Sequence, residues 1–230
     1  MDPEDFYDFT STRPVVRLGS EGTRSVQWPS NTFSWARPAG TGGVVLLTGT
    51  EPQLKWRTFC ALVLEVATSM ECSMVLTLGA LLAEVAHSRP TPVFGTGYDP
   101  AVIERLGVEP SRYEGPTGIV GVLHDECLNA GIDSASLWAA VPSYVPSAPS
   151  AKAALALVER TTELLDTTVP TMDLTFEATA YEHEISQLVL EDGATADYVL
   201  HLEEQFDHDA QAVQSADDMV EELEQFLREQ

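Results

Sequence analysis

The sequence predicts an α/β protein with an acidic helical appendage at its C-terminus. Two observations support this. Up to about residue 169, short apolar runs of strand length alternate with segments of helical period, and this alternation is typical of α/β proteins. Residues 170–230 combine a helical apolar period with many acidic side chains. We therefore expect a core domain over residues 1–169 and an appendage over residues 170–230.

The first part of the core reads as β structure. Three short runs rich in β-branched and aromatic residues are separated by "GSEG" and "PS", which are typical of turns. These runs, Arg13–Leu18, Thr23–Trp28 and Asn31–Arg37, predict a β meander or hairpin over residues 13–37. The next run, Val44–Gly49, is apolar without alternation, as expected of a strand covered on both faces.

A helix is predicted directly after this strand. Thr50 and Gln53 have the spacing of a capping box, and Pro52 suits a first helical turn. Apolar residues then recur at helical spacing for about five turns. A second buried strand follows at Ser73–Gly79, so the sequence predicts a right-handed βαβ unit with two parallel strands.

Local signals mark four further elements of the core. A short strand is expected at Thr91–Gly95, followed by a short helix with Asp99 as its N-cap and Gly107 just past its end. Another strand is expected at Ala135–Pro142, and Ser150 can cap the helix after it.

The appendage carries most of the charge of the chain. Residues 170–230 hold 17 acidic side chains and one basic one, Arg228, which gives −16 of the total of −24. The apolar period nevertheless continues through this segment as far as Met219–Leu227. A disordered acidic tail would lack such a stripe, so two or three amphipathic helices are predicted.

Composition narrows the class of partner and the compartment. A net charge of −24 argues against nucleic acid or an anionic membrane as partner. The apolar runs are too short to predict a transmembrane helix, and "MDPEDFYDF" does not resemble a signal peptide. Cys60, Cys72 and Cys127 form an odd, unpatterned set, which predicts reduced, buried thiols in a cytoplasmic protein.

Glycines recur at every third position at Gly115, Gly118 and Gly121. A dinucleotide-binding loop needs G-x-G-x-x-G directly after a strand, whereas "VEPSRYE" is not strand-like and Glu114 would repel a phosphate. We favour a turn at Gly115, a helix capped by Thr117, and close packing of that helix on the sheet at Gly118 and Gly121. A small anion or a carboxylate could still bind the free N–H groups of this helix.

The sequence predicts no metal, no cofactor and no catalytic residues. His201, Glu204 and His208 share one helix face and could in principle bind a metal ion. Exposed histidines and acids are common on an acidic helix, so we favour the interpretation that these side chains are simply solvated. One acidic segment resembles a calcium-binding loop, but it has Ala212 at the position where such a loop requires glycine, so calcium binding is not predicted. The G-x-S-x-G motif of serine hydrolases is absent.

The best remaining candidates for binding follow two predicted strands. One group comes after Val44–Gly49 and the other after Ser73–Gly79, where open α/β sheets bind their ligands. The alternative, which we favour over a catalytic site, is a network of Arg–Glu pairs that holds these loops. Together with the glycine turn, the predicted binding residues are Glu51, Trp56, Arg57, Glu84, His87, Arg89, Tyr113, Glu114, Gly115, Thr117 and Gly118.

Three segments together resemble the proteasome-assembly-chaperone superfamily, in its actinobacterial-type branch: "GTEPQLKWRTF", "LGALLAEVAHSRPTPV" and "SRYEGPTGIVGVLHDECLNAGIDSASLWAAVPSYV". The resemblance covers most of residues 3–165. It implies a three-layer α/β/α fold with a phosphorylase- or hydrolase-like mixed sheet and a helical appendage. It also implies a homo-oligomer, for which a trimer is one candidate form, but no established reaction.

The chain departs from this family in two places. The resemblance implies an additional N-terminal segment with a first strand, so that "MDPEDFYDF" looks like the interior of such a protein. Proteasome-docking relatives often end in a hydrophobic residue, tyrosine and one more residue, whereas this chain ends "FLREQ", so insertion of a tail into a proteasome pocket is not expected.

The predicted function is therefore a non-enzymatic binding or assembly protein that self-associates and engages a protein partner. The alternative is a small-molecule-binding enzyme or sensor with its ligand at the carboxyl edge of the strands.

Overall fold

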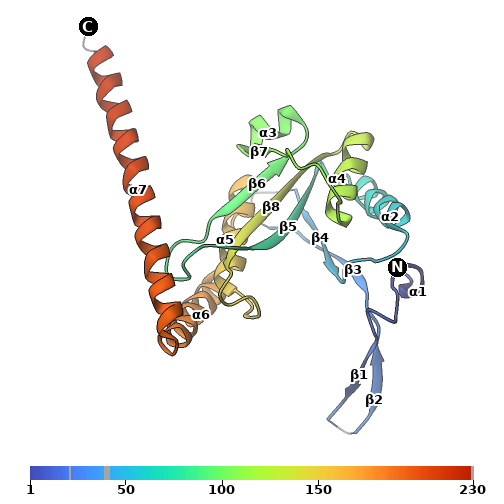
Figure 1. Cartoon of the computed structure of the whole chain (residues 1–230). Helices are drawn as coiled ribbons and strands as arrows, with labels where there is room; N and C mark the ends of the chain where they lie inside the picture. The colour runs from blue at the N-terminus through green and yellow to red at the C-terminus, as the bar shows by residue number, and fades with distance from the viewer. Residues whose placement is uncertain (21, 39–41, 229–230) are drawn as a thin grey trace. The chain divides into compact units, whose positions relative to one another are not determined.

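The computed structural model describes residues 1–20, 22–38 and 42–228, with side chains up to residue 212. Figure 1 shows the helices and strands along the chain. In order they are α1 (Pro3–Phe6), β1 (Val15–Leu18), β2 (Arg24–Gln27), β3 (Asn31–Ala36), β4 (Val44–Gly49), α2 (Trp56–Ser69), β5 (Met74–Ala83), β6 (Val93–Gly97), α3 (Pro100–Leu106), β7 (Glu109–Pro110), α4 (Ile119–Ala130), β8 (Asp133–Pro142), α5 (Ala151–Leu164), α6 (Met172–Leu190) and α7 (Gly193–Arg228).

The chain forms two compact units, and residues of β5, β6 and β8 fall in both. The first unit comprises Met1–Leu78, Gly95–Leu137 and Thr162–Val169. The second unit comprises Gly79–Phe94, Trp138–Thr161 and Pro170–Gln230.

The four-stranded sheet is mixed, with the strand order β5-β8-β6-β7. The N–H of Ser143, just past β8, donates to the carbonyl of Ala83 at the end of β5, so these two strands are parallel. The N–H of Ala140, late in β8, donates to the carbonyl of Pro92 just before β6, so β8 and β6 are antiparallel. Strands β6 and β7 pair in parallel. The mixed sheet implied by the family resemblance is confirmed.

The predicted βαβ unit is wrong, because β4 and β5 are not neighbours in a sheet. Strand β4 pairs over its whole length with β3 in an antiparallel hairpin. Only a short connection separates these two strands, so closing the hairpin costs less chain entropy than a crossover to a distant strand. Strand β4 is also half-buried to exposed rather than covered on both faces.

The β structure predicted over residues 13–37 forms parts of two hairpins rather than one meander. Strands β1 and β2 pair antiparallel with each other, and β3 pairs with β4 instead of with β2. The hairpin of β1 and β2 is therefore a separate two-stranded ribbon, drawn in blue in Figure 1.

Helix α2 begins at Trp56, so the capping box predicted at Thr50 and Gln53 is wrong. Lys55, which precedes the helix, has a left-handed backbone with φ of 52°. The N–H of Gln53 instead donates to the carbonyl of Phe6 at 2.8 Å. The N-terminal segment thus holds these residues in place of a first helical turn.

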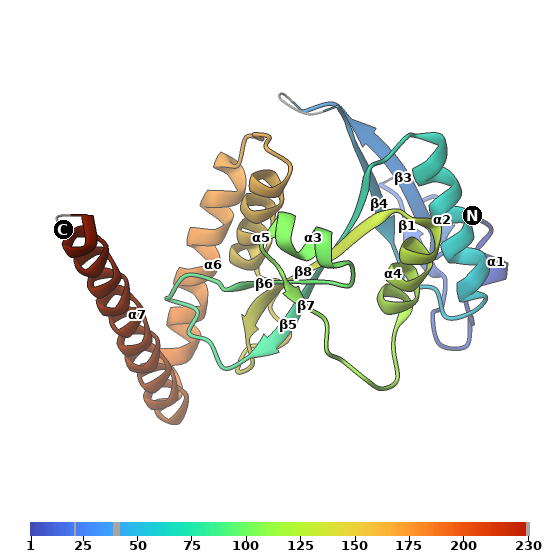
Figure 2. The ribbon, with the colours of Figure 1, turned by 90° about the horizontal axis from the view of Figure 1, so that it is seen from above.

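Helices cover both faces of the sheet in the first unit, as a three-layer α/β/α arrangement requires. Successive side chains of a strand point to opposite faces. Val75 of β5 packs on a core built from α1, α2 and α4, and Figure 2 shows α2 and α4 side by side. Met74 and Leu76, its neighbours on the strand, pack instead with Val102 of α3.

Two of the predicted helix caps are confirmed. The carboxylate of Asp99 accepts hydrogen bonds from the first turn of α3, and Gly107 ends that helix with φ of 60°. The hydroxyl of Ser150 accepts from the N–H of Ala153 at 3.1 Å, at the start of α5. Both signals act within a few residues, which is why the sequence predicts them well.

Helices α6 and α7 form the core of the second unit. Their buried apolar residues pack against one another and against Ala86 from the loop after β5, and they comprise Tyr181, Ile185, Val189, Val199 and Leu202. Helices α6 and α7 lie within residues 170–230, where the sequence predicts amphipathic helices. The domain boundary at residue 169 stays a prediction. The predicted apolar stripe at Met219–Leu227 lies outside the described side chains.

Two of the three thiols belong to the core. Cys60 and Cys127 are buried, and Cys72 is half-buried. Burial raises the pKa of Cys60 and of Cys127 to about 11, because it disfavours the thiolate. The two buried thiols are therefore inert core residues.

Candidate functional site

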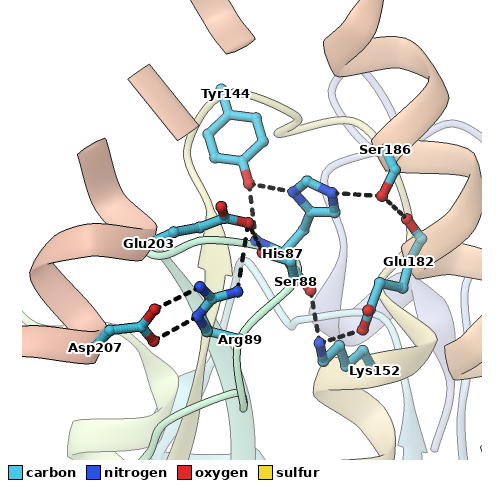
Figure 3. Close-up of polar contacts among 9 residues, drawn as sticks. All are labelled: His87, Ser88, Arg89, Tyr144, Lys152, Glu182, Ser186, Glu203 and Asp207. Carbon is cyan, nitrogen blue, oxygen red and sulfur yellow. Dashed lines mark hydrogen bonds and ion pairs between the residues drawn. The ribbon is translucent and has the colours of Figure 1, made fainter. Parts of the chain in front are cut away.

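A polar cluster surrounds His87 in the loop after β5 (Figure 3). His87 is only 5% exposed, and both of its ring nitrogens have partners. Nδ1 lies 2.8 Å from the hydroxyl of Tyr144, and Nε2 lies 3.0 Å from the hydroxyl of Ser186 on α6. His87, one of the residues predicted for binding, therefore lies at the centre of a hydrogen-bond network in the second unit.

The hydrogen bonds determine the protonation state of His87. The backbone N–H of His87 donates to the hydroxyl oxygen of Tyr144 at 2.8 Å, which leaves the Tyr144 proton free to donate to Nδ1. The hydroxyl of Ser186 donates to the carbonyl of Glu182, so it accepts from Nε2–H. His87 is thus neutral and protonated on Nε2, in agreement with burial, which lowers its pKa.

Lys152 of α5 ties the same loop to α6. Its ammonium group donates to the carbonyl of His87 at 2.6 Å and pairs with the carboxylate of Glu182 at 2.5 Å. One cation therefore connects three segments that are far apart in the sequence.

Arg89 ties the end of the loop to α7. Its guanidinium group donates two hydrogen bonds to Asp207, from Nε at 2.8 Å and from Nη2 at 2.7 Å, and Nη1 lies 3.5 Å from Glu203. The hydroxyl of Ser88 also donates to Glu203. Hydrogen bonding to Arg89 lowers the pKa of Asp207. The loop thus follows the pattern of the favoured alternative, a network of ion pairs, although its acids come from helices and not from Glu84.

The Tyr144→Phe variant tests whether this network stabilises the protein. Without the hydroxyl, the buried N–H and Nδ1 of His87 both lose their partner, so we expect the free energy of unfolding to fall by about 1–3 kcal/mol. Tyr113→Phe is the matched control, because the exposed Tyr113 hydroxyl makes one hydrogen bond, to the carbonyl of Pro116. Denaturant titration of both variants measures the difference. Equal losses in the two would show that the network contributes nothing special.

A second group of predicted residues lies in the first unit, at the start of α4. Oε1 of Glu51 lies 3.7 Å from the position that a Cβ on Gly118 would occupy, and Gly118 is the N-cap of α4. A carboxylate is favourable beside the positive end of a helix. The place where we expected a small anion to bind therefore already has the chain's own Glu51 beside it.

The residues before α4 form a closed turn. The hydroxyl of Tyr113 donates to the carbonyl of Pro116 at 2.8 Å. Gly115 has φ of 152°, and a Cβ there would come within 2.8 Å of that hydroxyl, so this turn requires glycine. The exposed Glu114 lies within it. Strand β7 does precede the turn, but it comprises only two residues, and it does not create the strand–turn–helix arrangement of a phosphate loop.

Two details of the predicted glycine helix are wrong. Thr117 does not cap α4, because the N-cap is Gly118 and no side chain makes a capping hydrogen bond there. Gly121 does not serve close packing on the sheet. A Cβ at Gly121 would instead clash with the Thr117 side chain, which folds over this turn of the helix.

The predicted binding residues are divided between the two compact units. Glu84, His87 and Arg89 belong to the second unit, and the other eight belong to the first. Trp56 donates from Nε1 to the carbonyl of Pro52 at 2.7 Å, while Arg57 and Glu84 are exposed. Since β4 lies in an antiparallel hairpin, the argument from a parallel carboxyl edge fails for the residues after it. A binding role for these residues stays a prediction.

A buried polar trio in the first unit was missed by the sequence reasoning. Nε2 of His124 on α4 lies 2.9 Å from the hydroxyl of Thr77 and 2.8 Å from that of Ser136, and these two hydroxyls lie 2.7 Å apart. Burial lowers the pKa of His124 to about 4. The available signal was three polar residues inside apolar runs of adjacent elements.

The partners of His87 and Arg89 were also missed. They come from the segment after β8 and from α5, α6 and α7, and they comprise Tyr144, Lys152, Ser186, Glu203 and Asp207. Glu182 of α6 joins the cluster through Lys152. Within the described side chains, no three or more His, Cys, Asp or Glu residues are grouped to hold a metal ion. Likewise, none of the described helices is long and apolar enough to span a bilayer.

Known proteins place this fold and these segments in a family. The sequence matches the PAC2 family over residues 1–189. A PAC2 family protein from Streptomyces avermitilis is 42% identical, with 86% of this chain and 84% of that chain covered and a TM-score of 0.78. A proteasome-assembly chaperone homologue from Mycobacterium tuberculosis is 45% identical, with 85% and 84% covered and a TM-score of 0.75.

A more distant structure shares the fold alone. The archaeal proteasome-assembly chaperone homologue PbaA from Pyrococcus furiosus is 18% identical, with 80% of this chain and 77% of that chain covered and a TM-score of 0.53. None of the curated proteins is similar enough to count as a match. The match over residues 1–189 and the two actinobacterial structures confirm the resemblance seen in the sequence, and the chain belongs to the PAC2 family.

Proposed function

We propose that this protein is a non-enzymatic binding and assembly protein, which self-associates and engages a protein partner. The observation that carries the proposal is the exposure of many large apolar side chains. They lie on the hairpins, on β5 and on α6, and they include Leu18, Trp35, Leu82, Met172, Phe176 and Leu190. Single exposed apolar residues are normal on a protein surface, whereas apolar side chains that share one face of an element mark sites of protein contact.

The chemistry of the His87 cluster favours this proposal over catalysis. A general base needs a free lone pair within reach of a substrate and a pKa near the working pH. Both nitrogens of His87 bond to the chain itself, and burial lowers its pKa. The hydrogen bonds and ion pairs of the cluster therefore have a structural role, which is to hold the loop after β5 against α5, α6 and α7.

The partner that we propose is a proteasome subunit or assembly intermediate in the cytoplasm. Two relatives are described as proteasome-assembly chaperone homologues, one of them 45% identical to this chain. The net charge of −24 favours a basic surface on that partner, because complementary charge speeds and orients association.

Affinity capture from native lysate tests the proposal. With the full chain as bait at low salt, we expect proteasome subunits to co-purify and to be depleted as the salt concentration rises, since screening weakens charge pairing. Recovery of the bait alone at low salt would contradict the proposal. A bait of matched mass and similar net charge controls for capture by charge alone.

No observation specifically favours the small-molecule alternative, and Glu51 already lies beside the helix N-terminus where an anion was expected. A thermal-shift screen of nucleosides, phosphates and amino acids separates the two functions. A ligand at a hundred times its dissociation constant would add about 2.7 kcal/mol of stability. We expect no such shift.

A further inference from the structure

The hairpin of β1 and β2 presents an apolar face to solvent. All eight of its strand residues are exposed. The register pairs Val16 with Val26 and Leu18 with Arg24, so these four side chains share one face. Leu18 is 76% exposed, and Val16 and Val26 are 44% and 49% exposed. This face is apolar at its centre and ends in an arginine.

Such a ribbon needs a second surface. A two-stranded hairpin alone in water is marginally stable, and its outer edges carry unpaired backbone groups. The side chains of the ribbon add one hydrogen bond, from Arg17 Nε to Gln27 Oε1 at 3.2 Å, and this bond lies within the hairpin itself. Burial of its apolar face against another surface would supply the missing stabilisation.

Charge indicates which kind of surface fits the hairpin. Residues 13–37 carry four of the chain's 12 basic residues, Arg13, Arg17, Arg24 and Arg37, and a single acid, Glu21. This segment therefore has a net charge of +3 in a chain whose net charge is −24. The complementary surface is apolar and acidic.

Helix α6 presents such a surface. Met172 is 71% exposed and Phe176 is 68% exposed, and both lie in its first two turns. Met172 is followed directly by the exposed Asp173, and Phe176 by the exposed Glu177. Two more exposed acids, at intervals of seven residues, extend this acidic row along the same face of the helix: Glu184 and Glu191. The sequence has no lysine or arginine from residue 170 to residue 190.

We propose that the β1–β2 hairpin of one copy of this protein docks on the exposed face of α6 of a second copy. The apolar residues Val16, Leu18 and Val26 cover Met172 and Phe176, and Arg24, on the same face of the hairpin, faces the acidic row of α6. This contact rests on the self-association in the proposed function and assigns it to two surfaces. Because the two surfaces differ, copies close either by reciprocal exchange in a dimer or as a ring.

Charge reversal tests the contact. The hairpin variant Arg24→Glu and the α6 variant Glu177→Lys each place like charges opposite one another. We expect each to raise the concentration at which the oligomer dissociates by at least about tenfold, measured by sedimentation velocity. The chain that carries both reversals should recover association. Both residues are exposed, so circular dichroism should show unchanged folding. Arg112→Glu, an exposed arginine outside the hairpin, is the control and should leave association unchanged.

Each outcome separates the contact from the broader function. If the wild type associates and neither variant weakens it, the assignment of surfaces is overturned while self-association stands. If both variants dissociate but the chain with both reversals does not recover association, the direct pairing of hairpin and α6 is overturned. If the wild type is a monomer of 25.0 kDa at every concentration, both the contact and self-association fail, while capture of proteasome subunits still tests the partner.

Discussion

The Leu137→Ala variant is expected to lose about 2–5 kcal/mol of its free energy of unfolding. Leu137 is 0% exposed in β8, which has β5 on one side and β6 on the other. A Cβ on Gly95 of β6 would come within 3.3 Å of its side chain, so the site is closely packed. Neighbours pinned in a central strand cannot collapse into the cavity, which places the loss in the upper part of this range.

Denaturant titration with tryptophan fluorescence measures this loss. Leu128→Ala on α4 removes the same atoms from a side chain that is 48% exposed, and it should cost well under half as much. Similar losses in the two variants would show that β8 does not lie at the centre of a packed sheet.

The stability of the protein should fall as pH drops from about 6.5 to about 4, because of His124. Burial lowers the pKa of His124 in the folded state to about 4 from an ordinary value of 6.5. Above pH 6.5 the histidine is neutral in both states and contributes no slope. Below pH 6.5 His124 binds a proton in the unfolded chain but stays neutral in the folded protein. The free energy of unfolding therefore falls by about 1.4 kcal/mol per pH unit. The total loss by pH 4 is about 3 kcal/mol.

His124→Gln isolates this effect, because glutamine does not titrate. Between pH 6.5 and pH 5 the free energy of unfolding should fall more steeply with decreasing pH in the wild type than in the variant. The difference in slope should approach that of one proton, about 1.4 kcal/mol per pH unit. His87, whose pKa is also lowered, adds slope of the same sign in both proteins and cancels in the comparison. Parallel curves would show that burial does not keep His124 neutral in the folded protein.

Features set by neighbouring residues could be predicted from the sequence. The caps of α3 and α5 depend on side chains within three residues of the helix start, and both are as predicted. The family was also predicted, because three long segments identify it together. The mixed sheet and its helices on both faces follow from that family rather than from any one pattern.

Features set by distant residues could not be predicted. The start of α2 depends on hydrogen bonds from the N–H groups of Gln53 and Leu54 to the carbonyl of Phe6, which replace the first helical turn that the local pattern favours. The partners of His87 and Arg89 include Tyr144 and Asp207, which lie 57 and 118 residues further along the chain. One sequence shows that these residues are polar but not which of them meet.

Sedimentation equilibrium of the wild-type chain over a range of concentrations tests self-association most directly. Exposed apolar residues on the β1–β2 hairpin and on α6 predict a mass that rises with concentration to at least twice 25.0 kDa. A mass of 25.0 kDa at every concentration would contradict self-association and show that these apolar surfaces remain in water or serve another partner.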